Sequence, residues 1–253
     1  MNMQIAIVTG ASSGIGKEFV RQLSYCYPWL DEIWVIARRE ENLKQLQKRI
    51  DAKLRILPLD LRKDSSFFTI QKLLKTEKPH VKVLVNAAGF GKIGKVSECT
   101  TNTIQGMITL NCTALTKMTT LCLPYCGKRS HVIQIASAAA FVPQPGLAVY
   151  AATKSYVLSL SRALRREVKQ EGITVTTVCP GPVDTEFFQK AGGSLSFAKK
   201  VCMAKADQVV HKAILDAAGG KELSVYGIPM NAVYVLCRII PHRVLLAVMN
   251  LIL

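Results

Sequence analysis

The sequence predicts an α/β protein, with one domain built on a doubly wound parallel sheet of about seven strands and a helical extension at its C-terminal end. Two observations support this. Short apolar runs alternate with helix-like segments, and the first run leads through a glycine-rich turn into a helix-like segment. A chain of 253 residues with 49% hydrophobic and 20% charged residues also fits a single well-buried domain. We expect that domain over residues 1–226 and the extension over residues 227–253.

The expected strands are short and apolar, as in parallel sheets whose two faces are both covered by helices. They span residues 3–8, 33–37, 54–60, 81–85, 131–136, 173–179 and 222–226. The clearest helical segments between them span residues 17–26, 65–75, 98–125 and 150–170. Ligands of such sheets bind at the carboxyl ends of the strands. The loop residues that directly follow each strand are therefore the most informative about function.

The first of these loops, residues 9–16 (TGASSGIG), joins a strand to a helix. Its glycines, Gly10, Gly14 and Gly16, are spaced G-x-x-x-G-x-G and let a backbone approach a pyrophosphate closely. The start of the following helix supplies unpaired N–H groups and a partial positive charge. This pattern predicts a dinucleotide site, although a tight turn without a ligand has the same local pattern.

The loop after the second strand bears on the choice of dinucleotide. An acidic residue there would bind the ribose 2′-hydroxyl of NAD, whereas arginine suits a 2′-phosphate. The sequence has Arg38 and Arg39 at this point, and Glu40 and Glu41 fit better in the first turn of the next helix. We therefore expect NADP(H) as the preferred cofactor, with NAD(H) as the alternative if the two arginines only form a solvated edge.

The composition bears on the partners of the protein, its cellular compartment and metal binding. The net charge of +16 is compatible with nucleic acid, an anionic membrane surface or phosphate-bearing ligands, but the lysines and arginines are dispersed, so no nucleic-acid partner is expected. The eight cysteines are scattered among apolar residues, which favours free thiols in a reducing, cytoplasmic location and no metal site. The first residues show no basic segment or cleavage site, so no signal peptide is expected.

The segment from Ser137 to Lys154 carries the chemistry. Tyr150 and Lys154 are four residues apart and lie on one face of a helix. A neighbouring ammonium lowers the pKa of a phenol, and such a tyrosine can donate a proton to a carbonyl oxygen or accept one from an alcohol. Ser137 can hold the same oxygen by a hydrogen bond. Tyrosine and lysine at this spacing also occur on ordinary helices, so the segment gains its meaning from the other motifs.

Taken together, the motifs resemble those of the short-chain dehydrogenase/reductase family over roughly residues 3–190. TGASSGIG resembles its cofactor loop, residues 86–89 (NAAG) its N-A-G motif, and residues 180–185 (PGPVDT) its P-G motif. Asn111, Ser137, Tyr150 and Lys154 match its catalytic tetrad in order and spacing. The resemblance implies a Rossmann fold and an NAD(P)-dependent oxidoreductase acting on alcohols and ketones.

The resemblance also implies roles for individual residues. Asn111 would kink the long helix and hold a water in a proton relay to Lys154, which would bind the nicotinamide ribose and lower the pKa of Tyr150. One departure is Ser13, where NADP-using members often have a basic residue, so the preference for NADP rests on the two arginines, helped by the Ser12 or Ser13 hydroxyl. The implied cofactor contacts are Gly10, Ser12, Ser13, Gly14, Ile15, Gly16, Arg38, Arg39, Asp60, Leu61, Asn86, Ala87, Ala88, Gly89, Tyr150, Lys154, Pro180, Gly181, Val183 and Thr185.

The substrate side is expected to be apolar. The family places its substrate contacts at residues 138–147 and in a loop at residues 186–205, whose apolar, glycine-containing sequence suits a mobile lid. The implied substrate contacts are Ser137, Ala139, Gln144, Leu147, Tyr150 and Phe187. Few polar anchors in an apolar pocket favour a lipophilic ketone or alcohol, although the phenylalanines could equally belong to the core.

Residues 227–253 differ from the glycine-rich ending of family members that reduce 3-oxoacyl groups, and look more like branches acting on steroids and other lipophilic substrates. Arg238, Pro241, His242 and Arg243 interrupt the apolar run, so two short amphipathic helices are expected instead of a membrane span. These helices could cover the cleft, pair subunits or rest on a bilayer as a peripheral contact.

The sequence thus predicts an NADP(H)-dependent oxidoreductase that interconverts a ketone and a secondary alcohol. A hydroxysteroid is the first expected substrate, and a 3-oxoacyl thioester of acyl carrier protein or coenzyme A is the alternative. A hypothesis of another class is a non-catalytic NADP(H)-binding sensor or scaffold. The resemblance further implies a homodimer or homotetramer formed through the helices at residues 98–125 and 150–170.

Overall fold

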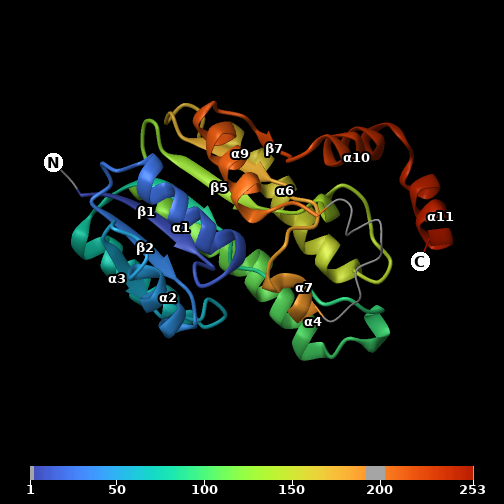
Figure 1. Cartoon of the computed structure of the whole chain (residues 1–253), viewed down its shortest axis with the longest axis horizontal. Helices are drawn as coiled ribbons and strands as arrows, with labels where there is room; N and C mark the ends of the chain where they lie inside the picture. The colour runs from blue at the N-terminus through green and yellow to red at the C-terminus, as the bar shows by residue number, and fades with distance from the viewer. Residues whose placement is uncertain (1–2, 192–202, 253) are drawn as a thin grey trace.

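The computed structural model describes residues 3–191 and 203–252 and contains a seven-stranded, all-parallel sheet (Figure 1). The strands are β1 (Gln4–Thr9), β2 (Glu32–Ile36), β3 (Leu54–Leu57), β4 (His80–Asn86), β5 (His131–Ile135), β6 (Thr174–Val178) and β7 (Leu223–Ser224). Their order is β3-β2-β1-β4-β5-β6-β7, so the chain reverses direction across the sheet between β1 and β4. The predicted doubly wound fold is therefore confirmed.

The helices cover both faces of the sheet. Those on one face are α1 (Gly14–Cys26), α2 (Glu40–Gln47) and α9 (Ala206–Ala218). Those on the other face are α3 (Asp64–Glu77), α5 (Leu115–Cys122) and α6 (Ala148–Glu167). The remaining helices are α4 (Thr101–Ile108), α7 (Glu186–Ala191), α10 (Ile228–Ile239) and α11 (His242–Ile252), with short 3₁₀ turns at Val96–Glu98, Leu123–Tyr125 and Ala138–Ala140.

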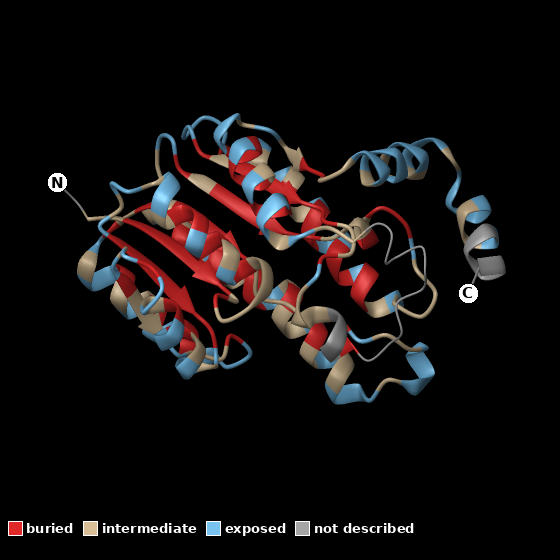
Figure 2. Ribbon diagram, in the orientation of Figure 1, coloured by how far each residue is buried: buried red, intermediate tan, exposed pale blue. Residues whose placement is uncertain are grey.

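Strand periodicity explains the two cores. Successive side chains of a strand point to opposite faces, so Ala6 and Val8 of β1 join one apolar cluster while Ile5 and Ile7 join the other. All four of these side chains are fully buried. Figure 2 shows the central strands as almost continuously buried, as expected of a sheet covered on both sides.

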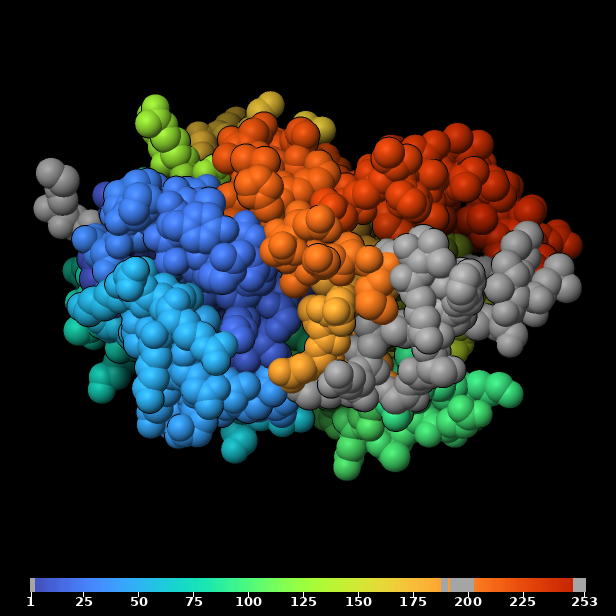
Figure 3. All heavy atoms as spheres, in the orientation of Figure 1, coloured from blue at the N-terminus to red at the C-terminus, as the bar shows by residue number. Residues whose placement is uncertain are grey.

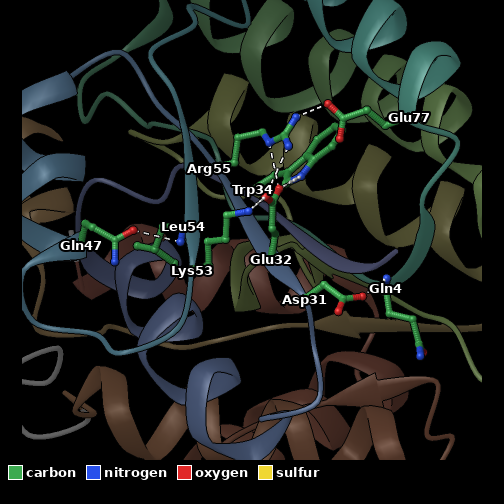
Figure 4. A network of polar contacts seen from close by, with 9 residues as sticks. All are labelled: Gln4, Asp31, Glu32, Trp34, Gln47, Lys53, Leu54, Arg55 and Glu77. Carbon is green, nitrogen blue, oxygen red and sulfur yellow. Dashed lines mark hydrogen bonds and ion pairs between the residues drawn. The ribbon is translucent and has the colours of Figure 1, made fainter. Parts of the chain in front are cut away.

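A polar network joins β2 to β3 and α3 at the edge of the sheet (Figure 4). The carboxylate of Glu32 is 3% exposed and accepts hydrogen bonds from Arg55 Nε at 2.8 Å and Trp34 Nε1 at 3.1 Å, and it pairs with Lys53 Nζ at 2.6 Å. Arg55 also pairs with Glu77. Burial raises the pKa of Glu32, but the hydrogen bonds from Lys53 and Arg55 outweigh burial and lower it overall.

Three elements differ from the sequence prediction. The strand expected at residues 54–60 ends at Leu57, because Pro58 has no N–H to continue the ladder. The helix expected at residues 98–125 is divided into α4, a π-helical segment η2 (Thr109–Ala114) and α5. Helix α9 was not predicted, although its buried residues repeat at helical spacing: Val209, Val210, Ala213, Ile214 and Ala217.

Residues 227–252 form two short helices, as expected. Neither α10 nor any other helix in the part of the chain that the structure describes is long and apolar enough to cross a bilayer. Helix α10 has no buried residue. In Figures 1 and 3 the two helices lie at the end of the molecule away from the N-terminal strands.

Candidate active site

A large cavity lies at the carboxyl ends of the strands. It has a volume of about 1080 Å³ and is lined by residues that follow β1, β2, β3, β4, β5 and β6. The cavity spans the position where the sheet order reverses, between β1 and β4, which is where doubly wound sheets bind their ligands. Its lining joins the glycine turn at one end to Ser137, Tyr150 and Lys154 further along.

The glycine turn has the backbone geometry of a phosphate cradle. Gly10 and Gly14 have φ angles of +69° and +53°, which a side chain would disfavour. Thr9 Oγ1 accepts hydrogen bonds from the N–H groups of Ala87 and Ala88, both at 3.1 Å, and so holds this turn against the loop after β4. Helix α1 begins directly after Ser13, which makes no side-chain capping bond, so its first N–H groups face the cavity end.

The two arginines after β2 line the same cavity but have different surroundings. Arg39 Nη1 pairs with the Glu186 carboxylate of α7 at 2.9 Å, and its Nε and Nη2 donate to Ser12 Oγ at 3.4 and 3.3 Å. Arg38 is exposed, and its charge helps hydrogen bonds from Arg62 to lower the pKa of Asp60. The Arg39 guanidinium therefore lies beside the glycine turn, whereas Arg38 acts on Asp60 after β3.

These residues fit the phosphate groups of a dinucleotide. The turn offers a helix N-terminus for a pyrophosphate, and the arginines offer planar donors for a 2′-phosphate. Of the residues predicted to contact the cofactor, all but Asn86 line the cavity. The side chain of Asn86 instead lies buried and donates to Thr119 Oγ1 and Gln134 Oε1, both at 3.0 Å, so it ties β4 to its neighbours.

Tyr150 and Ser137 lie together in the inner part of the cavity. Ser137 is held at the start of a 3₁₀ turn, where its Oγ accepts a hydrogen bond from the Ala139 N–H at 3.1 Å. Burial raises the pKa of Tyr150 to about 12, and a hydrogen bond with Ser137 opposes that rise. The Tyr150 phenol is therefore a protonated donor at neutral pH.

Lys154 approaches Tyr150 from the next turn of α6. Its Nζ lies 5.7 Å from the centre of the Tyr150 ring and donates to the Ile135 carbonyl at 2.7 Å. Burial lowers the pKa of Lys154 to about 8. The pKa of Tyr150 is therefore raised and not lowered as expected, because burial outweighs the hydrogen bond with Ser137 and Lys154 is not among the groups that shift it.

Asn111 does not line the cavity, and its side chain is fully buried in the π-helical segment. Its Oδ1 accepts from the Phe90 N–H at 3.0 Å, and its Nδ2 donates to the Phe90 carbonyl at 2.9 Å and to Thr153 Oγ1 at 3.0 Å. Thr153 Oγ1 in turn donates to the Tyr150 carbonyl at 2.7 Å. The Asn111 amide therefore positions the loop after β4 against the helix that bears Tyr150.

Sequence reasoning missed residues of this site that come from loops and from the C-terminal helix. A Cβ atom added to Gly91 would lie 2.9 Å from both Tyr150 Cδ2 and Phe187 Cζ, so the tyrosine ring packs directly on this glycine. Met230 and Val233 of α10 line the cavity as well. Gly91 could have been suspected from its place just after the NAAG motif. The sequence offered a cleft cover as one of three places for the C-terminal helices, but it did not single out Met230 or Val233.

The predicted substrate residues lie at the inner end. Ser137, Ala139, Gln144, Leu147, Tyr150 and Phe187 all line the cavity. The rings of Tyr150 and Phe187 are 5.4 Å apart. Of the expected lid at residues 186–205, residues 192–202 lie outside the described part of the chain, and the described part begins with α7.

Comparison with known proteins assigns the family. The family model described as short chain dehydrogenase matches residues 4–194. An uncharacterized oxidoreductase of Staphylococcus epidermidis is 30% identical over 184 residues, which cover 72% of this chain and 79% of the relative. A very-long-chain 3-oxoacyl-CoA reductase of Rattus norvegicus is 33% identical over 193 residues, which cover 72% of this chain and 60% of the relative. The chain therefore belongs to the short-chain dehydrogenase family and is an oxidoreductase.

Solved structures agree with this assignment. A short-chain dehydrogenase from Sphingobium yanoikuyae in complex with NADPH has a TM-score of 0.78 and 25% identity, and the match covers 94% of this chain and 96% of that one. One from Burkholderia phymatum in complex with NAD has a TM-score of 0.80 at 17% identity, over 93% of this chain and 92% of that one, and supports the fold alone. The two titles name different nucleotides, so they leave the cofactor preference open.

Proposed function

We propose that this protein is an NADP(H)-dependent oxidoreductase that interconverts a ketone and a secondary alcohol on a lipophilic substrate. The observation that carries the proposal is the continuous cavity that joins the glycine turn and its arginines to Tyr150, Ser137 and an apolar inner wall. The NADPH-bound structure from Sphingobium yanoikuyae supports the same choice of nucleotide by analogy.

In the reductive direction, a dinucleotide held by the glycine turn and the two arginines would supply the hydride that reduces the carbonyl carbon. Ser137 holds the carbonyl oxygen by a hydrogen bond, and its hydroxyl is oriented by the Ala139 N–H. Tyr150 then gives its phenolic proton to that oxygen. Burial keeps the phenol protonated at neutral pH, so the proton is present for transfer, and the alkoxide formed by hydride transfer is basic enough to take it.

Lys154 and Asn111 support this step without touching the substrate carbon. Lys154 lines the cavity with its Nζ 5.7 Å from the centre of the Tyr150 ring, where it would donate a hydrogen bond to the nicotinamide ribose. Asn111 and Thr153 fix the Phe90 backbone and the helix turn that carries Tyr150. We propose that Asn111 is a positioning residue.

Two substrate classes fit the apolar inner wall. The hydroxysteroid predicted from the sequence is the first, because Leu147, Phe187, Met230 and Val233 give a wide apolar surface with few polar anchors. A long-chain 3-oxoacyl thioester is the second, and the 33% identity to a very-long-chain 3-oxoacyl-CoA reductase favours it. The net charge of +16 suits the phosphates of coenzyme A but does not exclude a steroid.

The test is a steady-state assay of oxidation of NADPH and NADH with a panel of ketosteroids, 3-oxoacyl-coenzyme A esters of increasing chain length, and small polar ketones. We expect kcat/KM to be highest with NADPH and to rise with substrate apolarity in one of the first two groups. Turnover restricted to small polar ketones would contradict the lipophilic substrate. Binding of NADPH without turnover of any carbonyl would contradict the proposed function.

A further inference from the structure

Helix α10 is apolar on two opposite faces. Its inner face packs on the domain: Tyr234 stacks on Phe141 with ring centres 4.9 Å apart, and Met230 contacts Gly181 and lines the cavity. Its outer face carries Ile228, Val235 and Ile239, spaced seven and four residues apart along one side of the helix. A helix that is apolar all round is normally buried on all sides.

The outer face is nevertheless open to solvent. Ile228 is 87% and Ile239 73% exposed, with Val235 and Leu236 between them at 49% each. Val244 in α11 is 50% exposed. Figure 2 shows both helices as mostly exposed where they are described, which contrasts with the buried strands. Ile228, Ala232, Val235, Leu236 and Ile239 lie along one side of the helix, and we call this apolar stripe the α10 outer face.

The charged residues near this face indicate which kind of partner would bind it. Residues 227–253 contain no acidic side chain, and Arg238 and Arg243 are their only charged side chains, with His242 beside them. All three are exposed, and they flank the junction of the two helices. A second copy of the chain would bring these cations together without an acidic partner from the same segment. An anionic lipid surface would instead attract them.

Length supports an interfacial position. A helix of the length of α10 spans roughly 18 Å, well short of the roughly 30 Å hydrocarbon core, so it can lie along a bilayer but not cross it. We propose that the α10 outer face and α11 dock this protein on an anionic membrane surface, with the apolar stripe in the acyl boundary and Arg238 and Arg243 at the lipid headgroups.

This position connects the bilayer with the cavity. The inner face of α10 lines the cavity through Met230 and Val233, so a lipophilic ketone dissolved in the bilayer reaches the site by passing one helix. This delivery step rests on the proposed function, whereas the docking surface does not.

The docking surface is tested by flotation of the full chain with vesicles of phosphatidylcholine alone or mixed with phosphatidylglycerol. The wild-type protein is expected to float with the mixed vesicles, to float less with phosphatidylcholine alone, and to be released by high salt. The double variant Ile228→Glu/Ile239→Glu should bind at least about tenfold more weakly, because two apolar side chains no longer enter the lipid. Arg238→Ala and Arg243→Ala should each reduce the preference for anionic vesicles about fivefold.

The control is Phe68→Glu, which places a single glutamate on another exposed apolar residue, 70% exposed on α3, and is compared with the double variant. It should float like the wild type. Equal loss of binding in Phe68→Glu, or no flotation of the wild type with either vesicle, would overturn the proposal. A wild-type dimer that fails to bind vesicles and dissociates in the double variant would also overturn it, in favour of a second copy as the occupant.

Enzyme assays separate the docking surface from the chemistry. Both glutamate variants should keep wild-type thermal melting and wild-type activity on a water-soluble ketone, because the replaced side chains point to solvent. Vesicles should lower the apparent KM for a long-chain ketone in the wild type and leave it unchanged in the double variant. Vesicle binding without any ketone turnover would refute the proposed function and leave the docking surface standing.

Discussion

The Tyr150 ring packs directly on Gly91, so its position depends on the absence of a side chain there. A methyl group there would lie 2.9 Å from the tyrosine ring and 2.9 Å from the Phe187 ring, closer than real Cβ contacts. We expect Gly91→Ala to lower kcat at least about tenfold, since a shift of about 1 Å in a catalytic group has effects of this size. The affinity for NADPH should stay within a few-fold, because Gly91 does not line the cavity.

The control for this variant is Gly127→Ala, whose added Cβ would make only an ordinary contact at 3.4 Å with His80. It should leave kcat unchanged. The measurement is a steady-state assay combined with NADPH titration. A Gly91→Ala variant with normal kcat would show that the phenol has room to move without loss of function.

The burial of Lys154 predicts how the stability of the protein depends on pH. Its pKa falls from 10.5 to about 8 on burial, so between these values the unfolded chain binds more protons and the stability of the wild type rises with pH. Below that window the folded state carries the full penalty of a buried ammonium. We expect Lys154→Met to stabilise the protein near neutral pH by roughly 1–3 kcal/mol, after loss of the bond to Ile135.

The advantage of Lys154→Met should shrink as the pH rises toward 10.5, because the wild-type lysine is then neutral in the folded state. Thermal melts of both proteins across this range measure the difference. A difference in melting temperature that does not change with pH would show that the ammonium is not penalised by burial. Activity of the variant is not part of this test, since Lys154 lies in the site.

At the scale of elements, the ion pair between Arg39 and Glu186 joins the loop after β2 to helix α7. A 2′-phosphate at Arg39 competes with the Glu186 carboxylate for the same guanidinium donors. We expect Glu186→Gln to tighten NADPH binding a few-fold, as suits a half-exposed pair worth at most about 1 kcal/mol, and to leave NADH binding unchanged.

The control is Glu222→Gln, which removes the carboxylate from a similarly half-exposed pair, with Arg162 on α6. This variant should bind NADPH and NADH with the same affinities as the wild type. Fluorescence titration with both nucleotides is the measurement. An equal effect of Glu186→Gln on NADPH and NADH would contradict a 2′-phosphate site at Arg39.

The elements themselves were largely predictable, and the exceptions have physical causes. Strands covered on both faces are continuous apolar runs, so their positions could be read directly. Helix α9 was missed because Lys205, the residue before its first turn, makes no side-chain capping bond and is not a residue that marks the start of a helix. The π-helical segment reflects bonds from Asn111 to Phe90 and Thr153, which are distant in sequence and leave no local pattern.

The candidate site was predictable where the chemistry depends on turns at strand ends. The glycine turn, Arg38, Ser137 and the loop after β6 could be placed because each directly follows a strand of a parallel sheet. Met230 and Val233 could not, because α10 reaches the cavity only through tertiary packing. The raised pKa of Tyr150 could not be predicted from the sequence either, since burial depends on the whole surrounding structure.

For the whole molecule, we propose that the chain forms a homodimer or homotetramer through the outer faces of α4, α5 and α6. Ile108 on α4 is 47% and Tyr156 on α6 42% exposed, and Tyr156 Oη bonds Thr116 of α5 at 2.9 Å. We expect Ile108→Glu to weaken association at least about tenfold, since the proposed interface would bury this apolar side chain and the variant puts a charge there. Leu215→Glu on α9, 58% exposed, is the control.

Analytical ultracentrifugation in the absence of lipid measures this association. The wild type and Leu215→Glu should sediment as dimers or tetramers, and Ile108→Glu as a smaller species. A wild type that stays monomeric at high concentration would refute the interface.

The central claim is that Tyr150 gives its proton to the substrate oxygen inside a nucleotide-binding cavity. The most direct measurement is made on Tyr150→Phe, with NADPH affinity by titration and turnover of the preferred ketone determined on the same sample. The ring of phenylalanine keeps the packing on Gly91 and Phe187, so NADPH should still bind with an affinity within a few-fold of the wild type. Turnover should fall by at least about a hundredfold, the usual contribution of a general acid. Near-normal turnover in this variant would contradict the account.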